Sequence, residues 1–138
     1  MVQNHMLQLL CLVAMEPPYS LDPDVVRNAK MEVLRCLRPI TDQDVEDVTV
    51  RAQYSEGTAH GKPIPGYRRE NGIHPDSKTE TYVALKCFVE NWRWDGVPFY
   101  LRTGKALPHR ASEIAVQFKD IPQILFNANA QHPQPLQR

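Results

Sequence analysis

The stretch that most constrains the fold of this chain covers residues 91–105 and reads N-W-R-W-D-G-V-P-F-Y-L-R-T-G-K. Strand-forming residues flank the dipeptide Asp95-Gly96, and this pattern is typical of a β-hairpin. The upstream run predicts a strand over residues 81–94, and the downstream run predicts a second strand over residues 97–101. We therefore expect a hairpin that buries its aromatic side chains.

The hairpin is expected to end in two cationic side chains, Arg102 and Lys105, on a Thr-Gly turn. Pro98 lacks a backbone N–H, so the second strand should lie at a sheet edge or begin at this proline. Gly104 lets a ligand approach the backbone next to Lys105 closely. The pair is either solvated, as cations at strand ends often are, or binds a phosphate or carboxylate group.

Composition narrows the class of protein. The 138 residues suit one domain or one piece of a larger one. Sixteen basic residues balance sixteen acidic ones, which argues against a nucleic-acid binder. The first apolar run is too short to cross a bilayer, and it lacks the basic start and cleavage site of a signal peptide. We therefore expect a cytoplasmic chain without nucleic-acid or membrane partners.

The three cysteines are odd in number and widely spaced, at Cys11, Cys36 and Cys87. Such a set is typical of buried thiols in a reducing compartment rather than of a disulfide framework or a zinc site. The five histidines are scattered along the chain, so no metal site is expected.

The first sixteen residues predict a helix that is apolar on nearly every side and should be buried all round. A core helix is unusual at a terminus, and we expect that chain is missing upstream of it. His5 lies on this helix and allows two interpretations. It is either a core histidine that is bonded to a backbone carbonyl, or a general base whose partner carboxylate comes from elsewhere.

The remaining elements predict an α+β fold. A second helix should follow the Ser20-to-Pro23 start and end near Leu37. An acidic turn or short helix over residues 41–47 should lead into a strand over residues 48–54. The fold class expected is helices packed on one face of an antiparallel sheet.

Three later segments complete the prediction. Residues 55–78 read as a functional or mobile loop, whose G-Y-R-R run is either an anion site or a solvated basic patch. Residues 113–118 alternate like a half-buried strand with Ile114, Val116 and Phe118 inward. An apolar stretch over residues 121–126 follows, and the polar tail, residues 127–138, is expected to be disordered.

Six stretches of this chain resemble the glucose-6-phosphate dehydrogenase family of bacterial type. They are Q-N-H with L-Q-L-L-C-L-V-A-M-E-P-P, R-A-Q-Y, P-G-Y-R, T-E-T-Y-V-A-L-K, R-W-D-G-V-P-F-Y-L-R-T-G-K-A-L and E-I-A-V-Q-F. The resemblance covers residues 2–126, which match the first part of the family's C-terminal substrate and dimerisation domain. It implies that the N-terminal Rossmann domain, which binds the coenzyme, is absent from this chain.

The resemblance also implies an activity and a site. The family oxidises glucose 6-phosphate at C1 to the 6-phosphogluconolactone and reduces NADP, in the pentose phosphate pathway, and the whole enzyme is a homo-oligomer. His5 matches the family's general base, and Lys105 and Arg110 match two basic positions that contact the substrate. Ala111 and Ala115 stand where some members hold a second, structural NADP, so no such site is expected here.

The departures from the family pattern leave alternatives open. The coenzyme-binding Gly-rich unit and the D-H-Y-L-G-K-E element are absent, so the isolated chain should be inactive and the choice between NADP and NAD is not encoded here. One alternative is a non-catalytic remnant, or a domain that pairs through its sheet with a partner. Another is a sugar-phosphate binder that uses Lys105 and Arg110.

Overall fold

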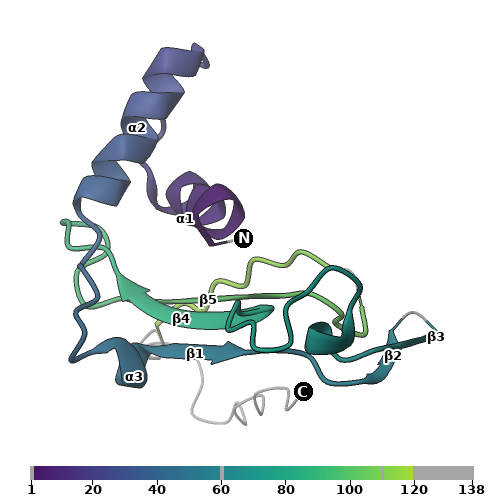
Figure 1. The fold of residues 1–138 in the computed structure, drawn as a ribbon. Helices are drawn as coiled ribbons and strands as arrows, with labels where there is room; N and C mark the ends of the chain where they lie inside the picture. The colour runs from purple at the N-terminus through teal and green to yellow at the C-terminus, as the bar shows by residue number, and fades with distance from the viewer. Residues whose placement is uncertain (1, 60, 110, 120–138) are drawn as a thin grey trace, which may run out of the picture.

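A computed structural model describes residues 2–59, 61–109 and 111–119, and a three-stranded antiparallel sheet forms its centre (Figure 1). The strand order is β1 (Thr49–Ala52), β4 (Tyr82–Phe88) and β5 (Pro98–Gly104). The central strand β4 therefore pairs with a neighbour on each side, and β5, which begins at its proline, lies at an edge of the sheet that the described residues form. This confirms what Pro98 predicted, since the strand's first residue has no N–H to give to a partner.

Helical segments accompany the sheet in the first part of the chain. They are the π-helical turn η1 (Val2–Met6), α1 (Leu7–Ala14), α2 (Pro23–Arg35) and the short α3 (Val45–Val48). Helices α1 and α2 lie on the same side of the sheet, and α2 projects away from it (Figure 1). The antiparallel sheet with helices on one side confirms the α+β fold class.

Helix α2 begins as its sequence predicts. The side chain of Asp22 accepts a hydrogen bond of 2.9 Å from the backbone N–H of Asp24, and Pro23 occupies the first helical position. The carboxylate satisfies one of the N–H groups that have no partner within the helix, and proline suits a position where its missing N–H is not needed.

The core lies between α1, α2 and the β4–β5 hairpin. Its buried cluster consists of Cys11, Ala14, Val33 and Val89, against which other apolar side chains pack, among them Trp94 and Phe99. The three cysteines are free thiols, and Cys11 and Cys87 are buried as expected, whereas Cys36 is only half-buried.

The prediction that the first helix is buried all round is wrong for the described residues. Helix α1 buries Leu10, Cys11 and Ala14, whereas 48% of Leu12 is exposed and His5 in the preceding turn is exposed as well. One side of α1 packs on the hairpin and on α2, and the described chain contributes no layer to cover the opposite side.

The β4–β5 hairpin differs from its prediction in two ways. Strand β4 ends at Phe88, and residues 89–97 form the connection, because the backbone turns at Asn91 and again at Gly96, where φ is 72°. Only part of the aromatic set is buried. Trp94 and Phe99 pack against the core, whereas the Trp92 and Tyr100 side chains are exposed.

The segment expected to be a long loop contains regular structure. Strands β2 (Gly57–Ala59) and β3 (Lys62–Ile64) form a second antiparallel hairpin, and the 3₁₀ turn η2 (Tyr67–Arg69) follows. Each strand is only three residues long, so the turn residues dominate the sequence pattern of this region.

The predicted half-buried strand over residues 113–118 is not observed. These residues form no strand, and Ile114, Val116 and Phe118 are exposed, the last by 84%. Alternating apolar residues favour a strand only where another strand offers its backbone groups, and none of the described strands pairs with this segment. The predictions for residues 121–126 and 127–138 lie outside the described residues.

Two further features of the described part of the chain are relevant to function. None of its helices combines the length and apolar character needed to span a membrane. No group of three or more His, Cys, Asp or Glu side chains within it is placed to hold a metal ion.

Candidate functional site

His5 lies in the π-helical turn η1, which leads directly into α1. Its side chain is exposed, and its imidazole makes no hydrogen bond with the described residues, so the interpretation as a bonded core histidine is wrong. Turns of π-helical type occur frequently at functional sites. The ring is thus accessible, and the placement of its backbone sets which positions the ring can reach.

The turn that carries His5 lies against strand β5. Lys105 follows directly after the last residue of β5, and its side chain is exposed. The turn of His5 contacts strand β5, and Lys105 follows the end of the same strand, although the two residues are far apart in sequence. Arg110, the third site residue predicted, lies outside the described residues.

The backbone of Lys105 is held by a buried residue. Its N–H donates a hydrogen bond of 2.8 Å to the carbonyl of Thr81, which is 3% exposed. The N–H of Thr81 donates to the carbonyl of Ala52 at 2.9 Å, and its Oγ1 accepts from the N–H of Tyr54 at 3.0 Å. Thr81 thus joins the end of β1, the start of β4 and the backbone of the lysine.

The residues on either side of Lys105 fix the path of the chain. Gly104 lies opposite Tyr82 in the β4–β5 register, and a Cβ added to the glycine would come within 2.8 Å of the tyrosine Cδ2. Ala106 has a φ of 56°, in the left-handed region that few non-glycine residues adopt. The lysine therefore lies at a sharply turned point of the backbone, supported by the sheet.

Gln53, in the R-A-Q-Y stretch, organises the loop that leads into β4. Its Nε2 donates to the carbonyls of Ser77 and Thr79, both at 2.8 Å, and its Oε1 accepts from Nε of Arg68 at 2.9 Å. The amide thus uses its donors and its acceptor to hold the chain just before Thr81, which is a structural role.

The P-G-Y-R stretch packs against the same loop. The rings of Tyr54 and Tyr67 meet edge to face with centroids 5.8 Å apart, and the Tyr54 hydroxyl donates to Glu70 Oε1 at 2.9 Å. Partial desolvation, together with this hydrogen bond, raises the pKa of Tyr54. Arg69 forms an ion pair of 2.9 Å with Glu56. Both arginines of the G-Y-R-R run are bonded to protein groups. This run is therefore better explained by a structural role than by anion binding.

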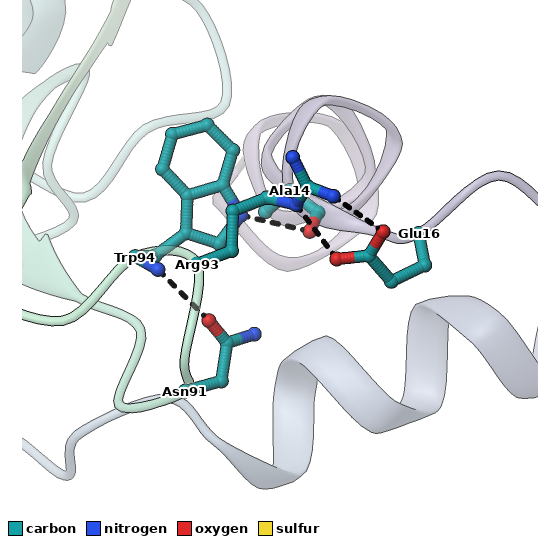
Figure 2. Close-up of polar contacts among 5 residues, drawn as sticks. All are labelled: Ala14, Glu16, Asn91, Arg93 and Trp94. Atoms are coloured by element: carbon teal, nitrogen blue, oxygen red, sulfur yellow. Dashed lines mark hydrogen bonds and ion pairs between the residues drawn. The ribbon is translucent and has the colours of Figure 1, made fainter.

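The connection between β4 and β5 is attached to the end of helix α1 (Figure 2). The indole Nε1 of Trp94 donates to the carbonyl of Ala14 at 2.9 Å. Arg93 donates from Nε and Nη2 to the two carboxylate oxygens of Glu16, at 2.6 and 2.7 Å. The Asn91 side chain accepts from the backbone N–H of Trp94 at 3.0 Å.

The contact between Arg93 and Glu16 changes the pKa of both side chains. The hydrogen bonds from Arg93 lower the pKa of Glu16, and the same contacts raise the pKa of Arg93. Sequence reasoning did not find this attachment, because its partners are about eighty positions apart. The only signal for it was the indole N–H of a half-buried tryptophan, which usually finds an acceptor.

Taken together, the fold and this site define an α+β domain in which one sheet edge supports an exposed histidine and an exposed lysine. A family model described as glucose-6-phosphate dehydrogenase, C-terminal domain, matches residues 1–137, and the chain belongs to this family. The resemblance noted in the sequence is thereby confirmed.

Curated relatives agree with this assignment. The chain is 55% identical to a glucose-6-phosphate 1-dehydrogenase of Rhizobium meliloti over 132 residues, which are 94% of this chain and 26% of the relative. It is 48% identical to the Bacillus subtilis protein of the same name, over 98% of this chain and 28% of that protein. The chain thus spans about a quarter of the length of these relatives.

Solved structures show the same fold. The glucose-6-phosphate 1-dehydrogenase of Mycobacterium avium matches with a TM-score of 0.62 and 44% identity, over 80% of this chain and 21% of that one. A glucose-6-phosphate dehydrogenase in complex with its substrate glucose-6-phosphate matches with a TM-score of 0.61 and 39% identity, over 75% of this chain and 20% of that one.

Proposed function

We propose that this chain is the segment of a glucose-6-phosphate dehydrogenase that supplies the catalytic base and part of the substrate site. The reaction would be oxidation of glucose 6-phosphate at C1 to the 6-phosphogluconolactone, with reduction of NADP. The observation that supports this most is the family match over residues 1–137, together with the contact of the His5 turn with strand β5 and the position of Lys105 directly after that strand.

His5 acts in this proposal as a general base. The imidazole takes the proton of the C1 hydroxyl, while C1 gives up a hydride and becomes the lactone carbonyl carbon. The exposure of the ring suits this role, since a base must reach the substrate hydroxyl. Lys105, and Arg110 by resemblance, hold the phosphate or hydroxyl groups of the sugar through charge-assisted hydrogen bonds.

The residues of this chain do not fit a dinucleotide. The described strands form antiparallel pairs, and the sequence has no Gly-rich loop between a strand and a helix. We therefore place NADP on a part of the enzyme other than this segment. The same proposal makes residues 1–126 a partial substrate and dimerisation domain of a cytoplasmic homo-oligomer in the pentose phosphate pathway.

The test uses a full-length dehydrogenase that contains this segment. His5→Asn removes the base but keeps a polar side chain, and kcat should fall by about 100-fold or more, since general bases contribute roughly 10²–10⁴-fold. Lys105→Gln should mainly raise KM for glucose 6-phosphate. A His5→Asn enzyme with an unchanged kcat would overturn the proposal. NADP reduction by the isolated 138-residue chain would show that the chain needs no other part.

A second candidate is a domain that only pairs with a partner chain. Exposed apolar side chains favour it, namely Leu12 on α1 and Ile114, Val116 and Phe118 after β5. Mixing the chain with a full-length enzyme should then change the sedimentation of the chain.

A third candidate is a sugar-phosphate binder. It predicts that calorimetric titration with glucose 6-phosphate releases or absorbs heat, and the absence of this heat would exclude that role.

A further inference from the structure

We propose that Trp94 is a positioning residue for His5, which it orients by holding the end of helix α1. The inference rests on the proposed role of His5 as the base. Trp94 itself contacts neither His5 nor, in this proposal, the substrate, and its effect passes through the helix backbone.

A hydrogen bond joins the side chain of Trp94 to the end of helix α1. The indole Nε1 of Trp94 donates to the carbonyl of Ala14, the last residue of α1, at 2.9 Å (Figure 2). The last carbonyls of a helix have no N–H partner within the helix. The indole satisfies one of them and thereby fixes the end of α1 to the connection between β4 and β5.

The indole of Trp94 is itself held in place. Its ring meets that of Phe99 edge to face, with centroids 5.0 Å apart, and it packs against the buried cluster that includes Val89. The Asn91 side chain accepts from its backbone N–H, and the carbonyl of Trp94 accepts from the N–H of Val97 at 2.9 Å. The indole donor is therefore held in place by the β4–β5 hairpin and does not rotate freely.

Helix α1 links the attachment at Ala14 to the turn that carries His5. The turn η1 and helix α1 are continuous, so the helical segment runs from the turn of His5 to Ala14. Strand β5 supports η1, and Trp94 holds the opposite end. No described residue holds the imidazole by a hydrogen bond, so the placement of this segment sets which positions the ring can reach. A misplacement of 1 Å between reacting groups can cost roughly 100-fold in rate.

A neighbouring contact provides a matched control. Arg93 and Glu16 also join the same turn to the end of α1, but their side chains are 56% and 61% exposed. Exposed ion pairs contribute little to holding a structure. The half-buried indole bond and the exposed ion pair are adjacent, and only the indole bond should matter for the position of the base.

The experiment is done in a full-length dehydrogenase that contains this segment. Trp94→Phe keeps an aromatic ring and removes the donor, and it should lower kcat roughly 10- to 100-fold with a smaller change in KM for glucose 6-phosphate. Glu16→Gln should leave kcat within about 2-fold, as expected of an exposed pair. A kcat of Trp94→Phe equal to that of the unaltered enzyme would overturn the inference.

A second variant guards against loss of the fold. Incorporation of 3-benzothienylalanine at position 94 replaces the indole N–H by sulfur at nearly constant shape, and kcat should fall as for Trp94→Phe. A kcat equal to that of the enzyme with tryptophan would contradict the inference.

The His5→Asn variant is measured in parallel. If it abolishes turnover while both changes at Trp94 leave kcat intact, only the positioning role fails. If His5→Asn leaves kcat unchanged, the proposed function itself fails.

Discussion

Lys105 is fixed to the sheet through its backbone N–H, which donates to the carbonyl of the buried Thr81 at 2.8 Å. The lysine side chain remains exposed, so the contact leaves the ammonium group free for a ligand while the main chain is held. A cation presented in this way loses less conformational freedom on binding than one on a mobile loop.

The hydroxyl of Thr81 should be important for this arrangement. Thr81→Val keeps the shape of the side chain but removes the acceptor of the Tyr54 N–H, and an unsatisfied buried donor costs about 1–3 kcal/mol. Urea titration of the chain should show a loss of this size. Thr81→Ser keeps the hydroxyl and should lose clearly less, and equal losses for the two variants would show that the hydrogen bond is not the cause.

Gly104 should not tolerate a side chain. Gly104→Ala places a Cβ 2.8 Å from Cδ2 of Tyr82, and such overpacking costs about 1–3 kcal/mol of the free energy of unfolding. The tyrosine is the cause of the clash, so Tyr82→Ala should reduce the cost of the alanine when both are combined. A double-mutant cycle by urea titration measures this coupling. Additive losses would contradict the contact.

The contact between Glu16 and Arg93 should give the stability a dependence on pH. The hydrogen bonds lower the pKa of Glu16 in the folded chain, so folding is favoured by the ionised carboxylate. This contribution is present above the unfolded pKa of about 4.3, and it is lost as the pH falls through the lower folded pKa.

The measurement is an NMR titration of the Glu16 carboxyl carbon, with the Arg93→Gln variant as the control. The midpoint should lie below the ordinary glutamate value in the unaltered chain and return toward it in the variant. A midpoint that is the same in both chains would show that Arg93 does not act on this carboxylate.

The buried thiol of Cys87 should resist alkylation. Burial raises its pKa, so less of the reactive thiolate is present at a given pH than for an ordinary cysteine. Native chain treated with iodoacetamide near pH 8 should be labelled at Cys36, which is half-buried, well before Cys87. Mass spectrometry of peptides gives both rates. In urea the two should react alike, and faster labelling of Cys87 in the native chain would contradict its burial.

Local signals predicted several parts of the fold correctly. Pro98 marks the start of an edge strand because proline cannot donate to a ladder, and Asp22-Pro23 marks the start of α2 because the two residues suit its first turn. These outcomes depend on the backbone chemistry of neighbouring residues. The sequence motifs also predicted the family, which the match over residues 1–137 confirms.

Contacts between distant parts of the chain decided the rest. The alternation in residues 113–118 predicts a strand, yet a strand needs a partner, and none of the described strands pairs with it. The indole of Trp94 reaches the end of α1 only because the hairpin and the helix pack together.

The same distinction applies to the candidate site. The sequence alone determined which residues could take part in a site. The imidazole of His5 can accept a proton and the ammonium group of Lys105 carries a positive charge, and both properties come from the side chain itself. Tertiary structure decided that the turn of His5 lies on β5, at whose end Lys105 stands, and that His5 is exposed. The physical reason is that propensity acts over a few residues, whereas the placement of a site follows from burial and hydrogen bonds that join segments far apart along the chain.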